Sequence, residues 1–147
     1  MHDVISIQAR SGRLPLAVSL ALFATAGAAN TAITVSVRTF LATGLAVAGV
    51  YALARYAQRV DRDRLARLSL ALWISFLAVT PAHVVGLEAA ASMLPGASTP
   101  AILALTGLTW ATMLAAVGTT AFLGFREYGA TSAEVPEDRA LENGYDF

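Results

Sequence analysis

Long uncharged stretches alternate with short arginine-rich segments along this chain. The uncharged stretches extend from Leu14 to Val37, from Thr39 to Ala54, from Leu68 to Leu87 and from Ala89 to Phe125. A helix that crosses a bilayer needs about 20 mostly apolar residues, because the hydrocarbon core is about 30 Å thick. The pattern therefore predicts membrane-spanning helices, and only the last stretch is too long for a single helix.

Proline and glycine divide the last stretch. Pro95, Gly96 and Pro100 interrupt the helical pattern, since proline lacks the backbone N–H that a helix interior needs. The spanning part should therefore begin near Thr99 or Pro100 and end near Phe125. In total the sequence predicts four transmembrane helices, at about 14–34, 37–57, 68–90 and 100–125.

The positions of the arginines predict the orientation. Arg10 and Arg13 precede the first helix, Arg126 follows the fourth, and only Arg38 lies in the two links on the opposite side. The link between the second and third helices carries Arg55, Arg59, Arg62, Arg64 and Arg67. Cytoplasmic loops of membrane proteins carry an excess of basic residues. We therefore expect an all-α integral membrane protein of the cell membrane, a four-transmembrane-helix bundle of up-down topology with both termini in the cytoplasm.

The first helix allows a second interpretation. Arg10 and Arg13, the apolar residues Leu14–Phe23 and the triplet Ala26–Ala28 resemble a signal peptide with an Ala-x-Ala cleavage site. The apolar stretch continues past that site to Val37, which favours a retained helix. The remaining helices keep the same orientation under either interpretation.

Composition excludes several classes of protein. Of the 147 residues, 56% are hydrophobic and 14% are charged, whereas soluble domains have about 45–50% and about 25%. Ten arginines and ten acidic residues cancel, and there is neither lysine nor cysteine. These values argue against an ordinary soluble domain, a wholly disordered chain, a disulfide-rich secreted module and a nucleic-acid binder.

The C-terminal residues differ from the rest of the chain. Residues 127–147 contain six acidic residues against Arg139 alone, together with Gly129, Pro136 and Gly144. Such a segment cannot bury enough apolar surface to offset the entropy of ordering it. We expect a transmembrane domain at 1–126 followed by a disordered, acidic cytoplasmic tail at 127–147.

Few residues are suited to catalysis or to binding a cofactor. The chain has no cysteine, no Gly-rich phosphate loop, no Gly-x-Ser-x-Gly elbow and no His-Glu-x-x-His pair. His83 is the only histidine expected in the membrane, so one chain cannot supply two axial imidazoles for a haem. We expect no enzymatic activity, no cofactor and no metal site.

Three polar residues on the expected outer side are candidates for a site. Arg38 begins the second helix, Glu88 lies near the end of the third, and His83 lies deeper, just after Pro81. Ionisable groups at membrane depth are costly unless they are paired or hydrated. A bridge between Arg38 and Glu88 that pins two helices together is the leading expectation. A ligand or proton-linked site at His83 and Glu88, and simple hydration at the interface, are the alternatives.

The position of the first turn decides how Arg38 is interpreted. If the chain reverses at Asn30–Thr31, Arg38 lies about two turns inside the second helix and becomes a functional candidate. If it reverses at Thr34–Ser36, Arg38 lies at the interface. The length of the first uncharged stretch favours the second alternative.

Small residues recur at every fourth position on two helices, and such stripes allow backbones to approach closely. They are Gly44, Ala48 and Ala52 on the second helix and Gly107, Ala111 and Ala115 on the fourth. We expect them to pack within the chain rather than between chains. Trp110, near the middle of the fourth helix, is expected to be a packing residue.

The arginine-rich link has two interpretations. It is either a topology anchor or a docking site for anionic lipid headgroups, at about 1 kcal/mol per basic residue. Arg59, Asp63 and Arg67 would form a ladder of ion pairs if the helix were continuous there. A nucleic-acid role would need a larger basic surface with stacking aromatic residues, and is not expected.

The sequence favours a small multi-pass membrane protein without catalytic machinery. Its simplest role is that of an accessory or structural subunit, packing with a larger membrane-protein partner or with itself among membrane lipids. A small oligomeric transporter or channel with a polar site at the outer rim is the alternative, and an intramembrane enzyme is a third.

Overall fold

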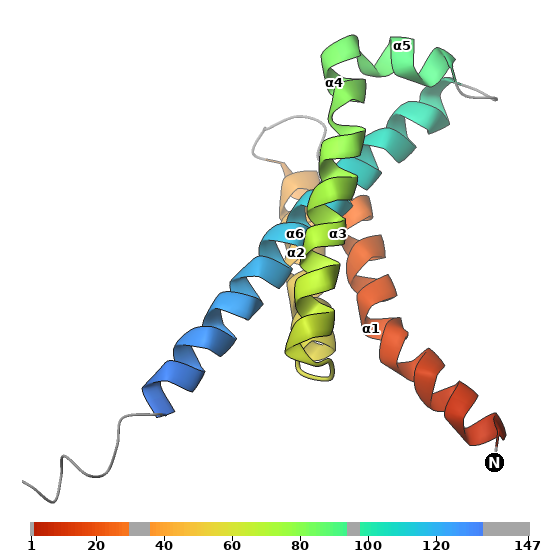
Figure 1. The fold of residues 1–147 in the computed structure, drawn as a ribbon. Helices are drawn as coiled ribbons and strands as arrows, with labels where there is room; N and C mark the ends of the chain where they lie inside the picture. Colours follow the sequence, from red (N-terminus) through yellow and green to blue (C-terminus); the bar gives the residue numbers. More distant parts are fainter. Residues whose placement is uncertain (1, 30–35, 94–97, 134–147) are drawn as a thin grey trace, which may run out of the picture.

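The computed structural model describes residues 2–29, 36–93 and 98–133. These residues form helices joined by short turns, with no strand among them (Figure 1). The helices are α1 (His2–Ala29), α2 (Val37–Ala57), α3 (Arg62–Val79), α4 (Pro81–Val85), α5 (Leu87–Ser92) and α6 (Ser98–Ala133). The expected all-α fold is confirmed for this part of the chain.

Three segments in the described part are long and apolar enough to cross a membrane. They are Val37–Ala57, Arg62–Val85 and Ser98–Ala130. The apolar part of α1, Arg13–Ala29, is shorter. At about 1.5 Å per residue it extends over about 25 Å, slightly less than a hydrocarbon core of about 30 Å.

The second predicted helix has the same bounds in the structure. Ser36 caps α2 in an extended conformation, and its Oγ accepts a hydrogen bond from the Thr39 N–H at 3.4 Å. A cap of this kind satisfies a backbone donor that the first turn leaves unpaired. Since α2 begins at Val37, Arg38 lies in its first turn, which matches the alternative that places Arg38 at the helix end.

The third predicted helix, 68–90, is three helices in the structure. It begins earlier, at Arg62, and is interrupted at Thr80 and again at Gly86. Pro81 begins α4 because it cannot donate the backbone hydrogen bond that would continue α3. Gly86 has φ 102°, a conformation that L side chains rarely adopt, and the chain changes direction there.

The fourth predicted helix, 100–125, is longer in the structure. Helix α6 extends from Ser98 to Ala133, so it ends about two turns after the predicted end near Phe125. Polar contacts of Arg126 and Glu127 join this part of α6 to the α2–α3 turn and the start of α3. The rest of the predicted tail, 134–147, lies outside the described residues.

Helix α6 is the centre of the fold. Helices α1, α3 and α5 pack against it, and α2 packs mainly against α1. Figure 1 shows α3 crossing in front of α6 while α1 and the C-terminal half of α6 diverge on either side. The core contains Phe23 of α1, Leu53 of α2, Leu72 of α3 and Ala115 of α6.

A second cluster of buried side chains lies toward the arginine-rich end. Tyr56, Ala57 and Leu65 form it, with Leu16 and Phe122 packed against them. Because Leu16 lies one turn from Arg13, the arginine end of α1 lies at the same end of the molecule as the α2–α3 turn.

Candidate functional site

An apolar groove lies between three helices of the molecule. Its volume is about 750 Å³, and α1, α3 and α6 each contribute lining residues. The walls are Leu20, Ala21 and Ala24 of α1 and Leu72, Ser75, Ala78 and Val79 of α3; the floor is Ala104, Leu108, Ala111 and Thr112 of α6. The sequence does not predict this groove, because its size depends on the distance between α1 and α3 where both helices pack on α6.

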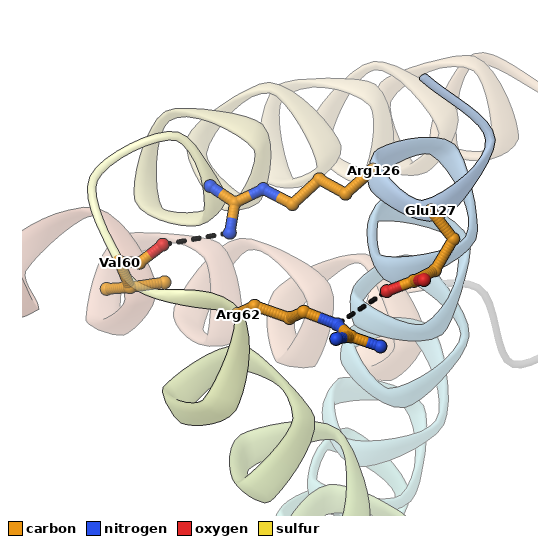
Figure 2. A network of polar contacts seen from close by, with 4 residues as sticks. All are labelled: Val60, Arg62, Arg126 and Glu127. Carbon is orange, nitrogen blue, oxygen red and sulfur yellow. Dashed lines mark hydrogen bonds and ion pairs between the residues drawn. The ribbon is translucent and has the colours of Figure 1, made fainter. Parts of the chain in front are cut away.

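The arginine-rich end is held together by Arg126. Its guanidinium donates hydrogen bonds to the carbonyl oxygens of Ala57, at 2.6 Å, and Val60, at 2.9 Å. Figure 2 shows the side chain reaching from α6 to the turn that follows α2. The last carbonyls of a helix lack intrahelical partners and attract positive charge. Arg126 therefore caps α2 from another helix.

The arginines of the α2–α3 link have different surroundings. Arg62 forms an ion pair with Glu127, Nε to Oε1 at 2.5 Å (Figure 2). Arg55 donates a weak hydrogen bond to the Tyr51 hydroxyl at 3.4 Å. The side chains of Arg59, Arg64 and Arg67 are exposed. All five lie at one end of the molecule, at the end of α2, in the turn or at the start of α3.

The ladder expected from Arg59, Asp63 and Arg67 does not form. It required one continuous helix, whereas α2 ends at Ala57 and α3 begins at Arg62. Arg59 therefore lies in the turn, out of register with α3. Arg62, in the first turn of α3, forms its ion pair with Glu127 of α6 instead.

The three polar residues expected on the outer side are all exposed and are not brought together. Arg38 is in the first turn of α2, His83 in α4 and Glu88 in α5. No ion pair between Arg38 and Glu88 occurs in the described part of the chain, which corrects the expected bridge. The break at Gly86 is the physical reason, since it separates α5 from the straight path of α3, and α5 packs against α6.

The two stripes of small residues are in different surroundings. Gly107, Ala111 and Ala115 are buried, and a Cβ on Gly107 would lie 3.2 Å from the Ala24 carbonyl oxygen of α1. This stripe packs within the chain, as expected.

On α2 the packing face within the chain is not the expected one. Gly44 and Ala48 are exposed and Ala52 is half-buried, and a Cβ on Gly44 would have nothing within 4 Å. The close contact is at Gly49, where an added Cβ would lie 2.5 Å from the Phe23 ring. The stripe at Gly44 and Ala48 therefore faces outward.

Polar side chains inside the bundle tie helices together. The Ser19 hydroxyl, fully buried on α1, donates to the Gly49 carbonyl of α2 at 2.8 Å. The Thr120 hydroxyl of α6 lies 2.9 Å from the Ser69 hydroxyl and accepts from Trp73 Nε1 at 3.1 Å. The sequence signal for these contacts is hydroxyl residues inside apolar stretches, which the sequence alone could not pair.

The described residues contain no group of three or more His, Asp or Glu side chains that could hold a metal ion. In this part of the chain every buried side-chain polar atom has a hydrogen-bond partner. No protein-family model, no curated protein and no solved structure matches the chain. The groove, the arginine-rich end and the outward face of α2 are therefore the features of the molecule that bear on its function.

Proposed function

We propose that this chain is a small multi-pass membrane protein without catalytic machinery that serves as an accessory or structural subunit, packing with a partner or with a second copy of itself. The observation that carries the proposal is the small share of each long apolar helix that is buried against other helices of the chain. Within an 18-residue apolar window of each span, only 17% of the residues of α2, 11% of α3–α4 and 28% of α6 are buried. Most of their apolar surface is free to contact lipid or another helix.

The outward face of α2 is the part of that surface best suited to another helix. Gly44 and Ala48 leave the backbone accessible, and Phe40, Val47 and Tyr51 are exposed around them. In a bilayer, helices associate through close packing at small residues, because lipid provides no hydrophobic drive. A flat strip of backbone between larger side chains supplies that packing.

We further propose that four helices span the cell membrane, with both termini in the cytoplasm. Helix α1 packs along α2, and α2 is one of the three segments long and apolar enough to cross a membrane. Arg13, the α2–α3 turn and Arg126 gather at one end of the bundle, and clustered arginines favour the cytoplasmic side.

Cross-linking in native membranes tests the subunit proposal. The chain has no cysteine, so Ala48→Cys introduces a unique thiol on the outward face of α2. We expect it to form a cross-link of one fixed mass, either a dimer of this chain or a complex with one partner. The control is Gly124→Cys, an exposed position on α6 with equally open surroundings, which should not cross-link.

Two results would contradict the proposal. Equal cross-linking at both positions would indicate random collision rather than an interface. A homo-oligomer whose centre conducts water or solute would instead support the small transporter or channel.

A further inference from the structure

Small side chains keep the groove between α1, α3 and α6 open. Its lining includes Ala21 and Ala24 on α1, Ser75 and Ala78 on α3 and Ala104 on α6. Larger side chains at these positions would fill the space between the walls. The volume of about 750 Å³ lies in the range of ligand sites, about 300–1,000 Å³.

An arginine lies on the groove side of each wall. Arg13 precedes Leu20 by seven residues, which is nearly two full turns and returns it to the same face of α1. Arg64 precedes Ser75 by eleven residues, about three turns, and shares the face of α3 that lines the groove. Both side chains are exposed, and the two helices approach the same end of the molecule.

Both arginines are available to an external anion. Arg62 and Arg126, their neighbours at this end, already bind Glu127 and the carbonyls that end α2. Between the arginines and the groove, residues 13–24 of α1 and 64–79 of α3 contain no acidic residue. Asp63, exposed and directly before Arg64, is the one acidic residue next to these two arginines in the sequence. The mouth of the groove therefore carries more positive than negative charge, and its interior is apolar.

The separation between the arginines and the groove matches the dimensions of one lipid leaflet. At about 1.5 Å per residue, the groove begins at Leu20, about 10 Å along α1 from Arg13, and at Leu72, about 12 Å along α3 from Arg64. It ends about 16 Å from Arg13 at Ala24, and about 22 Å from Arg64 at Val79. One leaflet contributes about 15 Å of hydrocarbon. A chain that begins at the level of the arginines would run through the groove and end near the middle of the bilayer.

We infer that the groove binds one anionic phospholipid of the cytoplasmic leaflet, with its phosphate between Arg13 and Arg64 and an acyl chain along Ala21, Ser75 and Ala111. The positive mouth selects the charge of the headgroup, and the apolar interior of about 750 Å³ accommodates a hydrocarbon chain. This inference rests on the membrane placement proposed above, but not on the identity of any protein partner.

Native mass spectrometry of the full chain in mild detergent tests the inference. After delipidation, the protein is incubated with dioleoylphosphatidylglycerol or with dioleoylphosphatidylcholine, and retained lipid is counted. We expect one phosphatidylglycerol to be retained in preference to phosphatidylcholine. Arg13→Gln with Arg64→Gln should weaken that retention by about 25-fold, since about 1 kcal/mol per basic residue corresponds to about fivefold each.

Two further double variants separate the groove from general charge attraction. Ala21→Leu with Ser75→Leu should fill the groove and abolish retention while both arginines remain. Arg38→Gln with Arg59→Gln removes the same charge at the opposite end and in the α2–α3 turn, and should retain the lipid like the parent. Circular dichroism and thermal unfolding identify any variant that fails to fold. In that case the single variant Ser75→Cys is used instead, and we expect phosphatidylglycerol to slow the reaction of its thiol with a maleimide.

The inference would be overturned by equal retention of the two lipids, or by full retention in the filled groove. Protection of Ser75→Cys by a second copy or a protein partner in lipid-free samples would also overturn it. These outcomes are independent of the cross-link at Ala48, so the lipid site and the subunit proposal can fail separately.

Discussion

At the scale of single residues, glycines with nearly identical sequence surroundings have opposite roles. Gly44 and Gly49 both lie in α2, yet Gly44 has open space around it and Gly49 contacts the ring of Phe23. The sequence shows that small residues line α2, but not which face meets α1, because alanine occurs on every face of this helix. Only the position of Phe23 on the neighbouring helix decides between them.

Alanine substitution distinguishes the two glycines. Gly49→Ala places a methyl group 2.5 Å from the Phe23 ring, and overpacking of this kind destabilises by about 1–3 kcal/mol. Gly44→Ala meets nothing and should be neutral or stabilise by up to about 1 kcal/mol through helix propensity. The free energy of unfolding in monodisperse micelles measures both, and equal effects would contradict the packing of Phe23 on α2.

Arg126 makes a second prediction at this scale. Arg126→Gln removes the charge that binds the carbonyls of Ala57 and Val60, and should destabilise by about 1–2 kcal/mol because hydrogen bonds from charged groups are stronger than neutral ones. Amide hydrogen exchange at the end of α2 should accelerate. The control is Arg59→Gln in the same turn, an exposed side chain whose removal should leave exchange unchanged.

At the scale of helices, the sequence predicted the bounds of α2 and missed the breaks near the end of α3. Ser36 and the flanking arginines mark α2 clearly in the sequence. Thr80–Pro81 and Gly86 lie inside an apolar stretch, where hydrophobic length favours a continuous helix. Gly86 has a positive φ and α5 packs against α6; both depend on the tertiary structure, which periodicity cannot show.

The break at Gly86 can be tested by removing its conformational freedom. Gly86→Ala disfavours φ 102° and favours one straight helix, so α5 should leave α6. In a Gly86→Ala background, Ala91→Cys, at a position 1% exposed, should react faster with a water-soluble maleimide. Ala89→Cys, already exposed, is the control, and unchanged protection at Ala91 would contradict this role of Gly86.

At the scale of the whole molecule, one end collects most of the positive charge in the described part of the chain. Leu16 and Phe122 pack against the cluster of Tyr56, Ala57 and Leu65, and Arg126 binds the α2–α3 turn. The arginines of three separate segments therefore lie at the same end. The sequence predicted this arrangement through the alternation of apolar and basic segments. It could not predict the groove beside it, which exists because α1 and α3 both pack on α6 with small residues between them.

The orientation of this end is the last prediction, and α1 is its critical element. If α2, the α3–α4 segment and α6 span the membrane, the arginine-rich turn and the end of α6 share a side. Because α1 packs along α2 with Arg13 at that same end, the N-terminus must lie there too, unless α1 leaves the bundle.

In the cysteine-free chain, Gln58→Cys and Met93→Cys should be labelled from opposite sides of sealed cells. Met93→Cys should be labelled from the outside, and Gln58→Cys only after permeabilisation. Reporter fusions before His2 and after Tyr128 should both report the cytoplasm. An external N-terminal reporter with the other three results unchanged would show that α1 does not span the membrane. Helix α1 is the element for which this outcome is physically reasonable, because its apolar part, Arg13–Ala29, is shorter than the hydrocarbon core is thick. External labelling of Gln58 would instead invert the whole bundle and move the arginines, with their proposed lipid, to the outer leaflet.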